Sequence, residues 1–151
     1  MKKIITTLVA FIFVTVAFSQ EVQYKDGKYY KDGELFTGTV YEYYEDGIVK
    51  MESNVEEGLL EGTTYLYYPN GYLKEQRSYT DGLKDGTWLQ WDQDQNKIAE
   101  ANFKNGLKDG YWYMWDKEGN KRYEIFYAEG KKQGNWYMWD ENGQLAYERQ
   151  Y

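Results

Sequence analysis

Acidic side chains recur at fixed intervals, and they are the residues best suited to catalysis. One recurring position holds Asp92, Asp116 and Asp140, and another holds Glu52, Glu100, Glu124 and Glu148. Two carboxyl groups at the right separation in a cleft can hydrolyse a glycosidic bond. Acids that repeat at equivalent positions are explained more simply as turn caps or as a solvated edge. We therefore predict that the chain is not an enzyme.

Most other catalytic chemistry lacks its usual residues. The chain has no histidine and no cysteine. It therefore lacks the usual ligands of zinc, haem and iron–sulfur sites, and it cannot form Ser–His or Cys–His nucleophile pairs. The segment 92–96 superficially resembles a calcium loop, but it lacks the central glycine and has Phe103 where a bidentate glutamate should stand. We predict no metal and no cofactor.

A second set of residues is suited to binding. The chain has 18 tyrosines and 6 tryptophans. Aromatic residues and methionine are enriched at protein interfaces, and exposed apolar patches often mark contact sites. The candidate partner-binding residues are Trp88, Trp112, Met114, Trp136 and Met138. The alternative is that the sheet curls at this end and covers its own tryptophans.

A strict repeat positions both sets of residues. Gly38, Gly62, Gly86, Gly110 and Gly134 are spaced by 24 residues without insertion. Each glycine is followed by an aromatic strand, a turn, a second strand and a second turn, without a helical apolar stripe. The sequence predicts an all-β fold: one elongated, twisted antiparallel meander of consecutive β-hairpin repeats. The repeats are 38–61, 62–85, 86–109, 110–133 and 134–151, preceded by a capping hairpin at 20–37.

The turns and the two faces follow from this pattern. Asp46-Gly47 and its counterparts are predicted to be tight turns with positive φ at both residues. The third repeat departs with Gln95, so its turn is either looser or strained. Alternation places the third and fifth positions after each glycine on one face, which is apolar or aromatic in every repeat and reads as structural. The second and fourth positions lie on the other face, where tryptophan occurs only in the last three repeats.

The first residues and the charge indicate an exported acidic protein. Residues 1–19 have two lysines, an apolar run from Ile4 to Phe18, and small residues at Ala17 and Ser19, as in a signal peptide cleaved before Gln20. The alternative is an uncleaved N-terminal anchor. Removing these residues changes the net charge from −7 to −9, because they hold two lysines and no acid. Such a charge disfavours binding to nucleic acid or to anionic membranes.

The unit Gly-x-Trp-Tyr-x-Trp-Asp-x-x-Gly, followed by a charged and aromatic strand and Asn/Asp-Gly-x-x-x-Gly, resembles a MORN repeat. It is most similar to the variant in bacterial YwqK-type antitoxins. Gly110–Gly119 and Gly134–Gly143 match best, and the resemblance covers 38–151. The resemblance implies an elongated sheet used as a protein-binding or scaffold surface, and an antitoxin-like role implies a toxin as the partner. The signal peptide departs from a cytoplasmic antitoxin and better fits an immunity or envelope-scaffold role in the periplasm or outside the cell.

Three binding roles follow from these observations. The first is an exported, non-catalytic interaction module for a protein partner, either a toxin or an envelope protein, with Leu145 to Tyr151 as an edge strand suited to strand addition or self-association. The second is a glycan-binding module in which sugars stack on the tryptophans. The third is peripheral membrane association through interfacial aromatic residues. No role in binding nucleic acid is expected.

Overall fold

The computed structural model describes residues 21–151, so the expected signal peptide lies outside the described residues. The described chain consists of strands joined by turns and short loops. The strands are β1 (Gln23–Lys25), β2 (Lys28–Lys31), β3 (Glu34–Leu35), β4 (Gly38–Tyr43), β5 (Val49–Glu56), β6 (Leu59–Tyr67), β7 (Leu73–Thr80), β8 (Leu83–Lys84), β9 (Gly86–Trp91), β10 (Lys97–Lys104), β11 (Leu107–Lys108), β12 (Gly110–Trp115), β13 (Lys121–Ala128), β14 (Lys131–Trp139) and β15 (Leu145–Gln150). Over this range there is no helix of the length and apolarity needed to cross a membrane.

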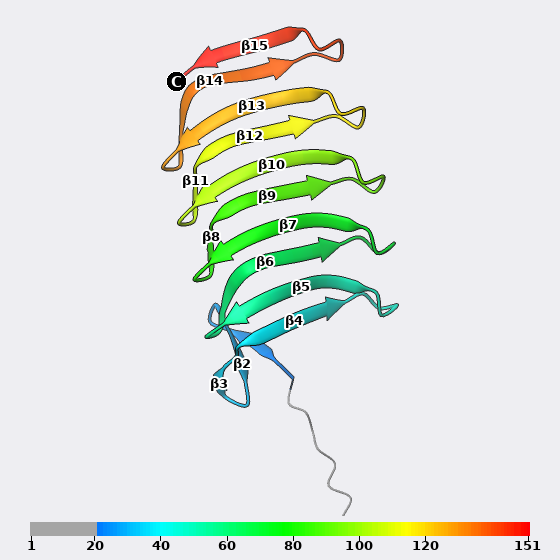
Figure 1. Cartoon of the computed structure of the whole chain (residues 1–151), viewed down its shortest axis with the longest axis vertical. Coiled ribbons are helices and arrows are strands. Elements are labelled where there is room, and N and C mark those ends of the chain that lie inside the picture. Colours follow the sequence, from blue (N-terminus) through cyan, green and yellow to red (C-terminus); the bar gives the residue numbers. More distant parts are fainter. Residues whose placement is uncertain (1–20) are drawn as a thin grey trace, which may run out of the picture.

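All five repeats lie in one open antiparallel sheet. The main path runs in chain order from β4 at one end to β15 at the other, and the short strands β8 and β11 pair with β7 and β10. Figure 1 shows the hairpins stacked side by side, with the N-terminal strands at the β4 end. The predicted all-β meander of hairpin repeats is confirmed.

The two ends of the hairpins use different turns. Positive φ at both residues marks the type I′ turns Glu57-Gly58, Asp81-Gly82, Asn105-Gly106 and Glu129-Gly130. At the opposite ends, only the last turn residue has positive φ. There the Gly47 N–H donates to the Tyr44 carbonyl at 2.9 Å, and the Tyr44 N–H donates to the Ile48 carbonyl at 2.8 Å. This is a three-residue loop closed by a glycine bulge. The prediction of positive φ at both residues was wrong for Asp46-Gly47, because the loop is one residue longer than assumed.

The third repeat keeps this three-residue loop without a glycine. Gln95 has a φ of 66°, and its N–H donates to the Asp92 carbonyl at 3.2 Å, as glycine does in the other repeats. Its side chain donates to the Leu73 carbonyl at 3.0 Å. Of the two possibilities left open by the sequence, the structure therefore shows a strained turn.

A bulge explains why glycine recurs every 24 residues. At Gly110, the preceding Asp109 N–H donates to the Asn102 carbonyl at 3.0 Å, and the Asn102 side-chain amide donates to the Tyr111 carbonyl at 2.7 Å. Gly110 has a φ of 97°, and a Cβ there would lie 3.1 Å from the Asn102 Cβ. Only glycine meets both requirements easily. The bulge separates β11 from β12, which both pair with β10.

Three short strands precede the repeats in the segment for which a capping hairpin was predicted. They form a small separate sheet, β1–β2–β3. Backbone hydrogen bonds attach it to the first type I′ turn: the Tyr29 N–H donates to the Gly58 carbonyl at 2.8 Å, and the Gly58 N–H donates to the Phe36 carbonyl at 2.8 Å. A Cβ at Gly58 would lie 2.7 Å from the Leu35 side chain and 3.0 Å from the Tyr29 carbonyl oxygen.

The N-terminal strands cover one face of the first two repeats. Burial, together with the nearby Tyr24, Glu42 and Tyr79, raises the pKa of the Tyr29 hydroxyl. The most buried residues of β4, β5 and β6 are Val40, Ser53, Val55 and Thr64, and they share the face that carries Glu42. The opposite face is open, since Tyr41 is 48% exposed. Small residues therefore occupy the covered face because the N-terminal strands fill the space above it.

The repeats beyond this cover form a single layer. In repeats three to five, only Phe103 and Tyr127 are buried among the hydrophobic residues. Most other large side chains of these repeats are half-buried by their neighbours within the sheet. The predicted division into a structural face and a contact face is therefore too sharp here, because both faces meet solvent.

Candidate binding groove

Five rings pack in succession on the face that carries the predicted tryptophans. We call Tyr79, Trp88, Phe103, Trp112 and Tyr127 the aromatic ladder. Successive ring centroids are 5.6, 4.8, 5.2 and 5.3 Å apart, with the planes tilted by 48° to 60°. These separations and tilts are favourable for aromatic pairs, and each pair stabilises the sheet by about 0.5–1.5 kcal/mol beyond the area it buries.

The repeat register builds the ladder. Gly86 pairs with Phe103 and Gly110 pairs with Tyr127. Because glycine has no side chain, the ring opposite it has room to lean across the strand toward the neighbouring tryptophan. The same spacing of 24 residues therefore places a tryptophan between two smaller rings in successive repeats.

Two of the three indoles are fixed by a hydrogen bond to the preceding strand. The Trp88 indole N–H donates to the Ser78 carbonyl at 3.1 Å, and the Trp112 indole N–H donates to the Asn102 carbonyl at 3.0 Å. The Trp136 indole N–H is buried and has no partner within residues 21–151. The strand register there is equivalent to that of the preceding repeat, since Tyr127 pairs with Lys132 as Phe103 pairs with Lys108.

A lysine lies over each tryptophan ring. Lys84 Nζ is 4.5 Å from the ring centre of Trp88 and 5.1 Å from that of Phe103. Lys108 Nζ is 4.0 Å from Trp112, and the Lys132 ammonium is 4.4 Å from the third tryptophan. At such distances a cation is attracted to the ring face. The tryptophan face of this acidic protein therefore carries a row of positive charge.

A groove of about 350 Å³ opens on this face over β9, β10 and β12. Among its lining residues are Ala99 and Ala101 of β10, flanked by Trp88 and Trp112. Ala101 pairs with Trp88 across the sheet. The hollow exists because the methyl side chain of Ala101 is much smaller than the indoles on either side of it.

The two ends of the groove differ in chemistry. One end is lined by the ion pair of Arg77 and Glu75, whose Nη2 and Oε2 atoms are 2.6 Å apart. The other end is apolar and is lined by Met114, Tyr123 and Ile125. The arrangement suits an apolar side chain seated on the alanines, with a polar group at one end.

The structure brings together only part of the predicted site. Trp88, Trp112 and Met114 line the groove, and Met114 is 52% exposed. Trp136 and Met138 do not line it. Trp136 packs instead on Tyr147 and Tyr151, with ring centroids 5.3 and 6.5 Å apart. The alternative was that the sheet curls over its own tryptophans, but Trp88 and Trp112 are half-buried by their ladder neighbours instead.

Sequence reasoning missed the alanines and the cations. Ala101 occupies the position that is Ser53, Arg77, Ile125 and Arg149 in the other repeats. A small residue between two tryptophan positions is the signal that predicts a hollow. Lys84, Lys108 and Lys132 likewise stand where the first repeat has Leu60, which marks a change in the environment of that position.

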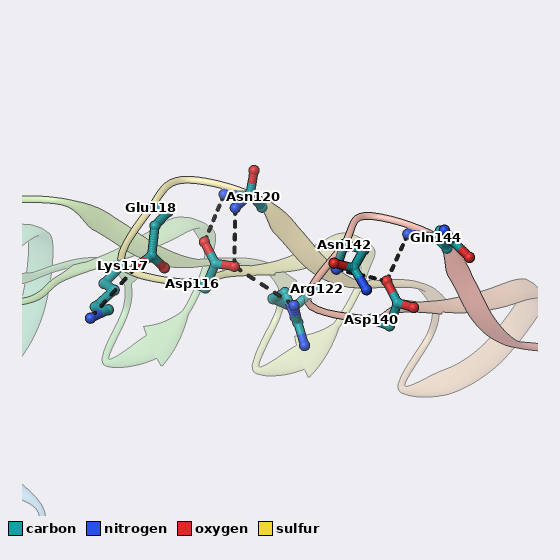
Figure 2. Close-up of polar contacts among 8 residues, drawn as sticks. All are labelled: Asp116, Lys117, Glu118, Asn120, Arg122, Asp140, Asn142 and Gln144. Atoms are coloured by element: carbon teal, nitrogen blue, oxygen red, sulfur yellow. Dashed lines mark hydrogen bonds and ion pairs between the residues drawn. The ribbon is translucent and has the colours of Figure 1, made fainter.

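The aspartates of the first acidic position cap turns. Figure 2 shows Asp116 and Asp140 at the two loops nearest the β15 end. Asp116 Oδ1 accepts the Asn120 N–H at 2.8 Å, and Asp140 Oδ1 accepts the backbone N–H groups of Asn142 and Gln144 at 2.9 and 2.8 Å. The interpretation of these aspartates as turn caps is confirmed.

Hydrogen bonds within these loops also set the acidity of two of the aspartates. The side-chain amide and backbone N–H of Asn96, with the N–H of Asp94, lower the pKa of Asp92 despite the opposing effect of burial. Burial raises the pKa of Asp116, but the backbone and side chain of Asn120 and the charge of Arg122 outweigh it, so the pKa is lowered. These carboxyl groups are held ionised, which suits capping.

The glutamates of the second acidic position lie on the face opposite the ladder. Glu124 pairs with Tyr113 and Tyr137 on the neighbouring strands. It also forms an ion pair with Lys121, as Glu100 does with Lys97 at 2.9 Å. Within residues 21–151, no group of three or more acidic side chains is arranged to hold a metal ion.

Comparison with known proteins finds a repeat family that matches part of the chain. The family model described as "MORN repeat variant" matches residues 36–57, 60–81 and 132–151. Of the two segments expected to match best, Gly134–Gly143 lies within the third range, whereas Gly110–Gly119 lies outside all three. No curated protein matches the chain. A chain of the GtfA/B complex bound to UDP and GlcNAc is similar over 99% of this chain and 28% of its own length, with 9% identity and a TM-score of 0.31. Three segments of the chain, two at the β4 end of the sheet and one at the β15 end, therefore match the model of this repeat variant.

Proposed function

We propose that this protein is a non-catalytic interaction module that binds a segment of a partner protein in the groove between Trp88 and Trp112. The observation that carries the proposal is the groove itself, an apolar hollow with an alanine floor and rigid aromatic walls. MORN-type repeats suggest a binding or scaffold role, and the groove adds a location. Aromatic side chains lose little conformational entropy on binding, so a preformed hollow of this kind favours docking.

The acidic positions support a non-catalytic role. The aspartates accept hydrogen bonds from their own turns, and Glu100 and Glu124 are paired with lysines on the opposite face. A general acid or nucleophile must reach a reacting group in a cleft. The groove instead contains apolar side chains and the internally paired Arg77 and Glu75.

Export and an immunity-like role complete the proposal, and both are supported by sequence alone. Residues 1–19 have the features of a signal peptide, which would place the groove in the periplasm or outside the cell and make a toxin or an envelope protein the natural partner. N-terminal sequencing of the protein expressed from the full chain tests export: Gln20 as the first residue supports it, and retention of residues 1–19 contradicts it.

The groove is tested by filling it. Ala101→Trp places an indole on the floor, and Gln76→Trp places one on the opposite face of β7 as a matched control. A random 12-residue peptide library is displayed and selected against the wild-type chain, and the dissociation constants of the selected peptides are measured by calorimetry. We expect the peptides to bind the wild type and Gln76→Trp alike and to bind Ala101→Trp at least roughly tenfold more weakly.

Two results would refute the proposal. The first is a set of selected peptides that bind Ala101→Trp as well as they bind the wild type, because the groove is then not the docking site. The second is an absence of selected peptides combined with a tryptophan fluorescence change on adding soluble cell-wall glycan fragments. That change, if lost in Ala101→Trp, would make the groove a glycan site instead.

A further inference from the structure

We infer that the partner segment is an extended, acidic peptide whose carboxylates pair with Lys84 and Lys108 while an apolar side chain enters the groove. This inference rests on the proposed function and specifies the chemistry of its partner.

The lysines of the two faces differ in their partners. On the face opposite the ladder, Lys97 and Lys121 each form an ion pair with a glutamate of the same strand. On the ladder face, neither Lys84 nor Lys108 has a carboxylate within 4.0 Å among residues 21–151, although the chain has 25 acidic residues and only 18 basic ones. Charge complementarity therefore favours an anionic partner on the ladder face.

The acids nearest these lysines are already engaged. Asp85 and Asp109 follow Lys84 and Lys108 in sequence, and each accepts a backbone N–H from the next type I′ turn, at 2.9 and 3.1 Å. Glu75, at the end of the groove, is paired with Arg77. Within the described residues, the two ammonium groups are held by ring faces rather than by carboxylates.

The repeat sets the spacing that a ligand must match. Lys84 and Lys108 are one repeat apart, which is two strands of the sheet and therefore about 9.6 Å. A polyproline II segment rises about 3.1 Å per residue, so every third side chain lies on one edge about 9.3 Å apart. A β-strand spaces same-face residues by about 6.7 or 13.4 Å. An extended segment of the polyproline II type with an acid at every third residue fits best.

The molecule itself shows how an extended segment lies on this face. The N-terminal strands cover the same face over the first two repeats, held by hydrogen bonds such as that from the Tyr29 N–H to the Gly58 carbonyl.

The probes are fluorescein-labelled peptides of four Glu-Pro-Leu triplets, the matching Gln-Pro-Leu and Lys-Pro-Leu peptides, and a peptide of the first composition with its glutamates clustered. Proline after each glutamate holds that residue extended. Fluorescence anisotropy gives each dissociation constant. We expect the regular glutamate peptide to bind the wild type roughly tenfold more tightly than the glutamine peptide, the effect of two partly exposed ion pairs. The lysine peptide should bind more weakly than the glutamine peptide, and the clustered peptide more weakly than the regular glutamate peptide. Added salt should reduce the differences between the dissociation constants.

Variants of the lysines show which of them produce the preference for the glutamate peptide. Lys84→Met with Lys108→Met keeps the apolar stems and should abolish the preference for glutamate over glutamine. Lys97→Met with Lys121→Met removes two lysines from the opposite face and should leave the preference intact. The double Lys→Arg variant at positions 84 and 108 should retain it, and near-ultraviolet circular dichroism checks that each variant is folded.

The outcomes separate this inference from the proposed function. Equal binding of the glutamate and glutamine peptides, lost in Ala101→Trp, would leave the groove as a docking site and overturn the acidic partner. If no triplet peptide binds, the inference is overturned. The display selection would then still test, independently, whether the groove is a docking site. The inference would also be overturned if the protein sedimented with phosphatidylglycerol vesicles in a way that depends on Lys84 and Lys108 and showed no preference among the peptides. An anionic membrane would then be the partner.

Discussion

Replacing each tryptophan of the last three repeats by phenylalanine should separate Trp136 from Trp88 and Trp112. The substitution keeps an aromatic ring but removes the indole N–H. At Trp112 that group donates to the Asn102 carbonyl at 3.0 Å, whereas at Trp136 it is buried without a partner among the described residues. The same chemical change therefore removes a favourable hydrogen bond at one position and an unfavourable buried donor at the other.

The magnitudes follow from these contacts. The smaller ring loses about 0.5–1 kcal/mol of burial at each half-buried position. Trp112→Phe also loses a hydrogen bond worth about 1 kcal/mol, so we expect a total destabilisation of about 1.5–2 kcal/mol. Trp136→Phe regains about 1 kcal/mol or more by removing the unpaired donor, so its stability should be unchanged or slightly higher. The expected difference between the variants is about 2 kcal/mol.

Urea unfolding followed by far-ultraviolet circular dichroism measures these free energies, with Trp88→Phe as a second hydrogen-bonded position. Because terminal repeats can unfold locally, amide hydrogen exchange in β14 and β15 should accompany the Trp136→Phe measurement. If Trp136→Phe costs as much as Trp112→Phe in both measurements, the indole N–H at position 136 is satisfied in solution and the reasoning fails.

Three smaller changes test the turns. Gly58→Ala should destabilise the protein by at least roughly 1 kcal/mol more than Gly47→Ala, because a Cβ at Gly58 meets the Tyr29 carbonyl oxygen at 3.0 Å and one at Gly47 meets nothing within 4 Å; equal urea midpoints would contradict it. Gln95→Gly should raise stability by about 0.5–1 kcal/mol, since it relieves a left-handed residue at the loss of one exposed hydrogen bond; a lower thermal midpoint would contradict it. Hydrogen bonds from its own turn lower the pKa of Asp92, so its contribution is present above the unfolded-state value of about 4 and is lost as the pH falls through the lower folded-state value. The thermal midpoints of the wild type and Asp92→Asn should therefore converge below pH 4, and a gap that stays constant would contradict it.

The fold was largely predictable because its determinants are local. A glycine every 24 residues, with paired turn residues between aromatic strands, defines hairpins without long-range information. The turn types were harder to predict, because Asp46-Gly47 and Glu57-Gly58 read alike in sequence. The loop that ends at Gly47 has three residues, whereas the turn at Glu57-Gly58 has two. The hydrogen bond from the Gly47 N–H to the Tyr44 carbonyl shows the longer loop.

The candidate site was only partly predictable, because it depends on what covers each face. Tryptophans at regular spacing indicate the face on which the groove lies, and their absence from the first two repeats suggests a contact surface confined to one end. The structure gives a simpler reason: the N-terminal strands fill that space and leave room for Ser53 and Thr64 but not for an indole. Alanine has no reactive or hydrogen-bonding group, so nothing in the sequence marks Ala99 and Ala101 as the floor of a groove.

The position shared by Leu60, Lys84 and Lys108 connects architecture with recognition. Each residue is flanked by equivalent turns: the Gly82 N–H donates to the Leu60 carbonyl at 2.9 Å, and the Gly106 N–H donates to the Lys84 carbonyl at 2.8 Å. The backbone is therefore constant while the side chain changes from apolar to cationic at the point where the N-terminal cover ends. A lysine can bury its stem on an aromatic ring and keep its charge in water, which keeps an uncovered single-layer sheet soluble. It also leaves an ammonium group beside each indole of the aromatic ladder, so the residue that shields the uncovered face is the one that would select an acidic ligand.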